Sequence, residues 1–148
     1  MSSNPFNDEN LNPFDFAKDA AAKIAELTGV ASHDIALVLG SGWAKAADLM
    51  GETIATINAA EVPGFSKPHV EGHSPTIRSI KLPSGKHALV LGSRTHLYEG
   101  KGMEPVVHGV RTAVKAGCKV VVLTNACGGI NAGYKVGEPV LIRDHISL

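Results

Sequence analysis

The apolar positions of the chain predict alternating helices and strands. After Asn12, which is suited to cap a helix, apolar side chains recur at helical spacing until Gly29. This stripe consists of Phe16, Ala20, Ile24 and Leu27. Residues 35–39 form an unbroken apolar run of strand length, and a second strand candidate, residues 118–124, contains the apolar run 120–123. Residues 104–116 carry a second helical stripe. Such runs, alternating with helices, are typical of a largely parallel sheet that is buried on both faces.

The remaining segments have the pattern of short strands. Residues 76–82 alternate polar and apolar side chains, and the turn Ser84-Gly85 predicts a hairpin to a strand over residues 86–91. The segment ETIATIN before them and residues 139–143 near the end are further strand candidates.

These patterns predict an α/β protein, a single domain with a mostly parallel or mixed central β-sheet flanked by helices. More strands than helices are predicted, whereas a parallel sheet needs helices on both faces, so we expect the domain to be incomplete at its C-terminus. Residues 1–11 are polar and aperiodic, which predicts a loose N-terminal arm. Residues 12–148 would then form the N-terminal portion of one domain.

The composition makes several functional classes unfavourable. Of the 148 residues, 44% are hydrophobic and 19% charged, as in globular domains. Lys and Arg total 14 and Asp and Glu total 14, so the formal net charge is zero. Nucleic acid and membrane are therefore not expected partners, and any anion site must be local.

The location and the redox state follow from what the sequence contains. The first residues lack the charged and apolar regions of a signal peptide, and the apolar runs are too short to span a bilayer, so we expect a cytoplasmic protein. Cys118 and Cys127 lack the spacing of a zinc site, and we interpret both as reduced thiols.

The motif GSGW follows the first apolar run and opens a segment, residues 43–50, with a helical pattern. Backbone N–H groups and the helix N-terminus at such a junction bind phosphate in many α/β proteins. Lys45 occupies the third glycine position of a dinucleotide fingerprint, and the P-loop pattern is not matched, so those two readings lose support. A tight turn that needs glycine only for its backbone conformation is the alternative.

The segment GSRTHLYEG concentrates reactive side chains in one loop after a strand. Arg94 has the planar donor fork that suits phosphate, His96 can donate to the same anion, and Tyr98 offers a flat face for a sugar. Glu99 is suited to orient His96 and to keep it protonated. The alternative is a solvated loop with a surface Arg–Glu pair.

Two further loops carry weaker signals. His69 and His73 have the spacing H-x3-H, but the surrounding glycine and proline exclude a zinc-binding helix, so no metal is expected. His73 either folds over an anion site or has no role. In NACGGIN, the small residues from Ala126 to Gly128 let the backbone approach a ligand closely.

The loops that follow parallel strands meet at one edge of a sheet, which is the usual ligand crevice. The segments GSG, SRTH and NACGG each follow a predicted strand. Together they predict one site for phosphate or a phosphate-like anion.

In chain order, the segments GSGW, EVPGF with the later GH (Gly72-His73), GSRTHLYEG, LTNACGGIN and VGEPVLIRDHISL resemble the trimeric type of purine nucleoside phosphorylase. The resemblance covers nearly all of residues 35–148. It implies the nucleoside phosphorylase fold and the reversible phosphorolysis of purine (deoxy)ribonucleosides to the free base and (deoxy)ribose 1-phosphate. This is a pentosyltransferase reaction of purine salvage. The resemblance also implies inorganic phosphate as co-substrate, no metal or organic cofactor, and a homotrimer.

The resemblance further implies roles for individual residues. Phosphate contacts fall on Ser41, His73, Arg94, His96 and the backbone at Ala126. Tyr98 matches a residue that lies against the ribose, and Glu99 matches one that steadies the histidine. His96 and Glu99 are thus the expected catalytic pair. Cys127 stands where a small residue such as alanine is common in the family, a difference that should be tolerated.

Two alternatives stay open at this point. Methylthioadenosine phosphorylase shares the scaffold, and the residues that would distinguish its purine site are not in this sequence. The resemblance also implies a base-binding half beyond DHISL, and the second alternative is that the 148 residues alone are a non-catalytic fragment that binds phosphate or only packs in an assembly. The preferred purine base is not specified by the sequence.

Overall fold

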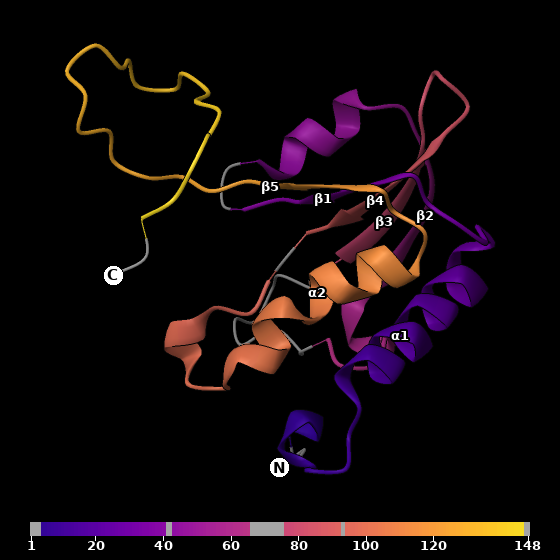
Figure 1. Ribbon diagram of the computed structural model, residues 1–148. Helices are drawn as coiled ribbons and strands as arrows, with labels where there is room; N and C mark the ends of the chain where they lie inside the picture. Colours follow the sequence, from indigo (N-terminus) through magenta and orange to yellow (C-terminus); the bar gives the residue numbers. More distant parts are fainter. Residues whose placement is uncertain (1–3, 41–42, 66–75, 93, 147–148) are drawn as a thin grey trace.

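The computed structural model describes residues 4–40, 43–65, 76–92 and 94–146. They form one mixed sheet with the strand order β2-β3-β4-β1-β5, together with two α-helices and four short 3-10 helices (Figure 1). The strands are β1 (Ile35–Val38), β2 (Glu52–Asn58), β3 (Thr76–Lys81), β4 (His87–Leu91) and β5 (Val120–Leu123). The helices are α1 (Pro13–Thr28), α2 (Met103–Lys115), η1 (Pro5–Asn7), η2 (Ala44–Leu49), η3 (Ala59–Glu61) and η4 (Leu97–Glu99).

The sheet has a parallel half and an antiparallel half. β1 pairs in parallel with both β4 and β5, and Ile35 lies opposite Ala88 on one side and Val120 on the other. β3 is antiparallel to β2 and to β4, and Gly85 lies in the turn between β3 and β4 with φ 81°. The predicted fold class and the predicted hairpin are both confirmed.

Helix α1 begins and ends where its local sequence predicts. The Asn12 side chain accepts hydrogen bonds from the backbone N–H groups of Phe14 at 2.9 Å and Asp15 at 3.3 Å. Gly29 ends the helix in the left-handed conformation, with φ 70°, and its N–H donates to the Ala25 carbonyl. Because both ends of the helix are satisfied by residues close in sequence, its bounds could be predicted without tertiary information.

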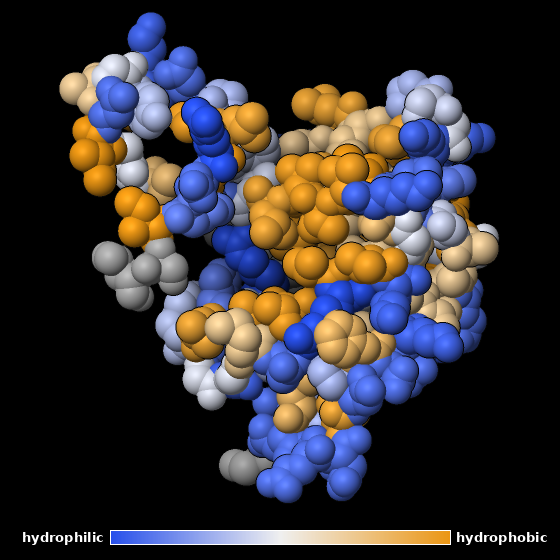
Figure 2. Space-filling model, viewed as in Figure 1, coloured by the Kyte–Doolittle hydropathy of each residue, from blue (hydrophilic) through white to orange (hydrophobic). Residues whose placement is uncertain are grey.

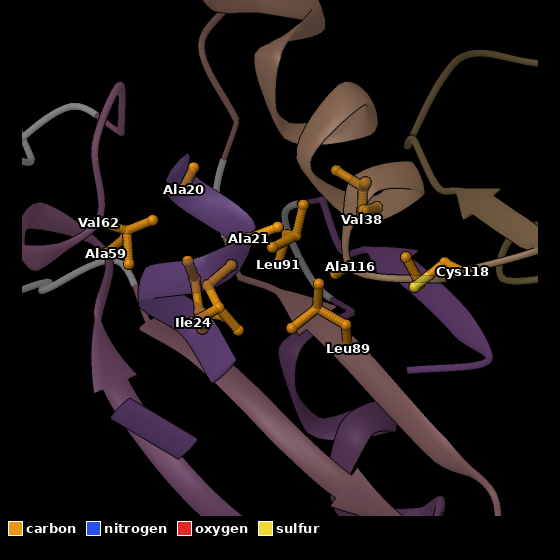
Figure 3. Close-up of a cluster of buried hydrophobic side chains, with 13 residues drawn as sticks. Ala20, Ala21, Ile24, Val38, Ala59, Val62, Leu89, Leu91, Ala116 and Cys118 are labelled. Atoms are coloured by element: carbon orange, nitrogen blue, oxygen red, sulfur yellow. The ribbon is translucent and has the colours of Figure 1, made fainter. Parts of the chain in front are cut away.

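The hydrophobic core lies on the face of the sheet that α1 and α2 cover (Figure 3). Ile24 of α1 and Leu89 and Leu91 of β4 are among its fully or nearly fully buried members. Alternate residues of the same strands point to the other face, where Val90 packs in a smaller cluster with Ala47 of η2. The two clusters account for the unbroken apolar runs in the central strands, because both faces of those strands are buried.

Two local predictions of secondary structure differ from the structure. Residues 43–50 were expected to form a helix, and they contain a 3-10 helix of six residues rather than an α-helix. Residues 139–143 were expected to form a strand, but residues 125–146 contain no helix or strand and are all exposed. A strand needs a partner for its backbone hydrogen bonds, and in the described part of the chain residues 139–143 have none.

β5 is less buried than its apolar sequence predicts. It is the last strand in the sheet order, and its Val120, Val122 and Leu123 are 53%, 38% and 64% exposed. Figure 2 shows hydrophobic side chains gathered on the side of the molecule along which β5 runs. The expectation of burial on both faces is therefore wrong for β5, which pairs on one side only within the described residues.

The N-terminal segment contacts the body of the domain. The ring of Phe6 in η1 lies 5.4 Å from the ring of Phe16 in α1 and 5.1 Å from that of His108 in α2. The Asn4 side chain also donates to the Lys101 carbonyl at 3.4 Å. Asn4 and Phe6 are thus held by contacts with the body of the domain, which the polar, aperiodic sequence did not predict, whereas residues 7–10 are exposed. Among the described helices, none is long and apolar enough to cross a membrane.

We expect Leu89→Ala to lower the free energy of unfolding by about 2–5 kcal/mol, because it leaves a cavity in the main core. The Leu89 side chain is 0% exposed, whereas Leu141 is 96% exposed. Urea unfolding measures the difference, and Leu141→Ala is the matched control, with an expected change below about 0.5 kcal/mol. Equal losses for both variants would contradict this location of the core.

Candidate functional site

The ends of the three parallel strands bring three loops to one edge of the sheet. Gly40 follows β1, Arg94 follows β4 and Thr124 follows β5. The ends are joined by backbone bonds, from the Leu39 N–H to the Leu91 carbonyl at 3.0 Å and from the Thr124 N–H to the Val38 carbonyl at 3.1 Å. The predicted convergence of the three loops is thus observed at their first described residues.

Arg94 crosses this edge and bonds to the end of β5. Its Nη1 donates to the Thr124 carbonyl oxygen at 2.6 Å. The Thr124 hydroxyl accepts from the Gly40 N–H at 2.9 Å and donates to the Val38 carbonyl at 3.0 Å. Arg94, which was singled out from the sequence, therefore lies among backbone groups from all three loops. Thr124 was not singled out, although its place between a strand and NACGG was a usable signal.

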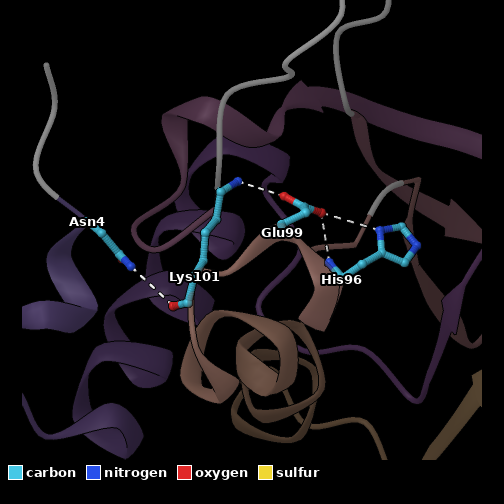
Figure 4. A network of polar contacts seen from close by, with 4 residues as sticks. All are labelled: Asn4, His96, Glu99 and Lys101. Carbon is cyan, nitrogen blue, oxygen red and sulfur yellow. Dashed lines mark hydrogen bonds and ion pairs between the residues drawn. The ribbon is translucent and has the colours of Figure 1, made fainter.

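His96, Glu99 and Lys101 form a polar network in and beside η4 (Figure 4). Glu99 Oε1 accepts from the His96 backbone N–H at 2.8 Å and lies 3.3 Å from His96 Nδ1. Glu99 Oε2 accepts from Lys101 Nζ at 2.8 Å. The predicted pairing of Glu99 with His96 is present, while Lys101, two residues further along, was missed.

The electrostatics of this network favour an ionised Glu99. The hydrogen bond from Lys101, followed by the bond from the His96 backbone, lowers the pKa of Glu99 from 4.5 to about 2. The carboxylate is therefore charged at any physiological pH. Its two oxygens accept hydrogen bonds from the His96 backbone N–H and from Lys101 Nζ. This charge holds the His96 ring at the start of η4.

The His96 ring also stacks on Tyr98. The ring centroids are 5.0 Å apart and the planes differ by 21°. Tyr98 is 85% exposed, so its flat face is open to solvent. The loop therefore presents an imidazole stacked on a phenol. The exposed side of the phenol is suited to a sugar or another flat, partly polar group.

The structure brings together only part of the predicted site. Arg94, His96, Tyr98 and Glu99 lie in one described loop, whereas Ser41 and His73 lie outside the described residues. Ala126 is exposed after β5, and within the described ranges no hydrogen bond joins it to Arg94 or His96. Their expected phosphate contacts stay predictions.

The structure also limits the contribution of a helix dipole. η2 has only six residues in a 3-10 helix, so the expected attraction of an anion to a helix N-terminus after GSGW is not supported. Arg94 is instead the charged donor that the structure fixes at this edge.

Of the described side chains, no group of three or more His, Cys, Asp or Glu is arranged to hold a metal ion. An open hollow of about 310 Å³ near Gly51 and Lys81 lies at the opposite edge of the sheet.

The family follows from a comparison with known proteins. The model of the family described as "Phosphorylase superfamily" matches residues 34–148. The chain belongs to this superfamily. The matched range contains β1 to β5 and every predicted site residue.

The relatives in this superfamily are purine nucleoside phosphorylases. The protein of that name from Cellulomonas sp is 54% identical over 151 residues, which cover 99% of this chain and 54% of that protein. The one from Mycobacterium leprae is 47% identical and covers 93% of this chain and 51% of its own length. The chain thus spans about half the length of the curated relatives it matches. The resemblance inferred from the motifs is confirmed.

Solved structures agree with the sequence relatives. The purine nucleoside phosphorylase of Schistosoma mansoni in complex with acetate superposes with a TM-score of 0.74 at 31% identity, covering 88% of this chain and 47% of its own. A purine nucleoside phosphorylase in complex with ribose-1-phosphate gives a TM-score of 0.75 at 31% identity, covering 87% of this chain and 47% of its own. The fold described above is therefore that of nucleoside phosphorylases.

We expect Glu99→Gln to lower stability at neutral pH and to lose this effect in acid. The pKa of Glu99 falls from 4.5 to about 2 on folding, so its carboxylate stabilises the fold above pH 4.5, and this contribution disappears as the pH falls towards 2. For a partly exposed ion pair the difference at pH 7 should be about 0.5–1 kcal/mol. Urea unfolding of parent and variant at several pH values measures it.

The matched control is Glu52→Gln, at an exposed position on β2. This variant should not reproduce the pH-dependent difference. A constant offset between parent and Glu99→Gln from pH 7 to pH 3 would contradict the role assigned to the carboxylate.

Proposed function

We propose that this chain carries the phosphate-binding part of a purine nucleoside phosphorylase. In that reaction, phosphate attacks the ribose carbon that bears the base, the glycosidic bond breaks with its electron pair leaving on the purine, and ribose 1-phosphate forms. The observation that carries the proposal is the Arg94 guanidinium, bonded to the Thr124 carbonyl where the three strand-end loops meet. The names of the curated relatives support it.

Arg94 is suited to hold the phosphate. A guanidinium has five N–H donors in a planar fork, and the 2.6 Å bond to Thr124 uses one of them. That bond fixes the fork and leaves the remaining donor capacity for an anion. Phosphate is a weak nucleophile, so the main catalytic task is to position it against an oxocarbenium-like centre, and a fixed cation with directed donors achieves this.

His96, Glu99 and Tyr98 complete the proposed arrangement from the same loop. Glu99 holds the His96 ring through Nδ1, so that the other ring nitrogen is available to the phosphate. Tyr98, stacked on His96, offers its exposed face to the ribose. Ser41, His73 and the backbone at Ala126 are proposed as further phosphate contacts. Inorganic phosphate is the co-substrate, and no metal or organic cofactor is part of the proposal.

The proposal extends to the assembly of the protein, its location and its partners. We propose a cytoplasmic homotrimer that acts in purine salvage, with a purine nucleoside and phosphate as its small-molecule partners. We propose a purine nucleoside phosphorylase and not a methylthioadenosine phosphorylase, because the curated relatives at 46–54% identity are named purine nucleoside phosphorylases.

We expect Arg94→Ala to weaken phosphate binding by about ten- to a hundredfold, the cost of losing a charged hydrogen bond to the anion. Arg94→Lys should restore only part of the affinity, because an ammonium group lacks the planar fork. Calorimetric titration of the chain with inorganic phosphate measures both. Arg111→Ala, on α2 away from the loop, is the control and should leave the affinity unchanged. An unchanged affinity in Arg94→Ala would remove this residue from the site.

Turnover of inosine by the chain alone distinguishes an enzyme from a fragment that only binds phosphate. We expect the 148-residue chain alone to give no measurable phosphorolysis of inosine, because the residues that would protonate the purine are not part of it. General acid catalysis is worth roughly 10² to 10⁴ in rate. Phosphate-dependent release of hypoxanthine measures turnover, and turnover by a soluble monomer of the chain would contradict both this expectation and the proposed trimer.

A chimera tests the proposed reaction itself. This chain replaces the matching 54% of the Cellulomonas protein and is joined to the remaining part of that protein. The chimera should cleave inosine only when phosphate is present, and Arg94→Ala in the chimera should raise the KM for phosphate more than the KM for inosine. A folded chimera without phosphate-dependent cleavage would overturn the proposed function.

A further inference from the structure

Thr124 joins all three strand-end loops through its own polar groups, although no role was assigned to it from the sequence. We propose that Thr124 is the positioning residue of the phosphate site. Its carbonyl fixes the Arg94 guanidinium, and its hydroxyl fixes Gly40. The inference rests on the proposed function, because it assigns Thr124 to the phosphate site of that reaction.

The Thr124 hydroxyl is held in one orientation. It donates to the Val38 carbonyl at 3.0 Å, and its oxygen accepts the Gly40 N–H at 2.9 Å. The Thr124 backbone N–H donates to the same Val38 carbonyl at 3.1 Å. Backbone and side chain of one residue therefore both bond to the end of β1. This extends the β1–β5 pairing one residue beyond the last ladder pair, Val38 with Leu123.

The position of Gly40 depends on this bond and on close packing. The Gly40 N–H is committed to the Thr124 hydroxyl, which fixes the direction in which the chain leaves β1. A Cβ on Gly40 would lie 3.1 Å from the Thr124 carbonyl oxygen and 3.4 Å from Arg94 Nη1. The absence of a side chain at Gly40 thus lets Arg94 reach the carbonyl.

The two functions of Thr124 are coupled through its backbone. The carbonyl that accepts Arg94 Nη1 at 2.6 Å belongs to the residue whose hydroxyl anchors it to β1. Without the hydroxyl, the Gly40 N–H loses its acceptor and the end of β5 loses a bond to β1. The acceptor for Arg94 is then less well fixed, and the guanidinium samples more orientations. A preorganised donor binds an anion more tightly than a mobile one.

Three variants test the proposal in the 148-residue chain, with inorganic phosphate as the probe. Thr124→Val removes the hydroxyl and keeps the shape of the side chain, and Thr124→Ser keeps the hydroxyl. Thr56→Val is the matched control at an exposed position on β2, at the far end of the strand order. We expect Thr124→Val to weaken phosphate binding about five- to tenfold, the loss of one net hydrogen bond. Thr124→Ser should restore the affinity to within about twofold, and Thr56→Val should leave it unchanged.

Two readouts without phosphate separate positioning from general stability. Amide hydrogen exchange at Gly40 should speed up about tenfold in Thr124→Val relative to neighbouring β1 amides, and return to the parental rate in Thr124→Ser. The guanidinium N–H signals of Arg94 in NMR spectra, assigned with Arg94→Lys, should show restricted rotation in the parent and faster rotation in Thr124→Val.

The outcomes distinguish the inference from the function on which it rests. If Arg94→Ala weakens phosphate binding as expected while Thr124→Val keeps parental affinity, the positioning role is overturned and the proposed function stands. If the parent does not bind phosphate, the proposed function fails, and unchanged Gly40 exchange and Arg94 rotation in Thr124→Val would overturn the positioning role as well. Faster exchange and rotation in that variant would support Thr124 as the residue that fixes Arg94, whatever ligand the loop binds.

Discussion

The parallel pairing of β1 with both β4 and β5 is the constraint on which the rest of the structure depends. It places one short strand between two others in matching register, with Leu37 opposite Val90 and Val122. Strands that run in the same direction end at the same edge, so the loops after β1, β4 and β5 meet there. The contacts of Arg94 with Thr124 follow from this arrangement. The two helices hold it in place by covering one face of the same strands.

The elements that could be predicted from the sequence are those whose causes are local. The bounds of α1 follow from the Asn12 cap and from Gly29, and the β3–β4 hairpin follows from alternation around a glycine turn. The exposure of β5 could not be predicted, because Val120 to Leu123 have the composition of a buried central strand. Whether such a strand has neighbours on both sides is decided by distant parts of the chain, to which a local pattern does not respond.

The same difference between local and long-range causes applies to the candidate site. The density of Arg94, His96, Tyr98 and Glu99 in one loop was visible in the sequence, and the Glu99–His96 contact spans only three residues. Lys101 was missed because lysine after a loop is unremarkable until its bond to Glu99 is known. The Thr124 bonds link residues that lie far apart in sequence and need the assembled sheet. Ser41 and His73 lie outside the described residues, so their predicted contacts rest on the sequence alone.

The order of the strands along the chain has a consequence for how the domain acquires its structure. β1 is the first of the described strands to be synthesised, yet its two neighbours in the sheet are β4 and β5, the last two of the described strands. The β3–β4 hairpin can close on its own, whereas the pairing of β1 with β4 and its pairing with β5 each require closing a long loop at an entropic cost before the hydrogen bonds of that pair form. On a ribosome, the apolar residues of β1 therefore have no β4 to pair with until the chain has passed Leu91, and no β5 until it has passed Leu123. Among the described strands, the pairings that bring Arg94 and Thr124 together should therefore form late.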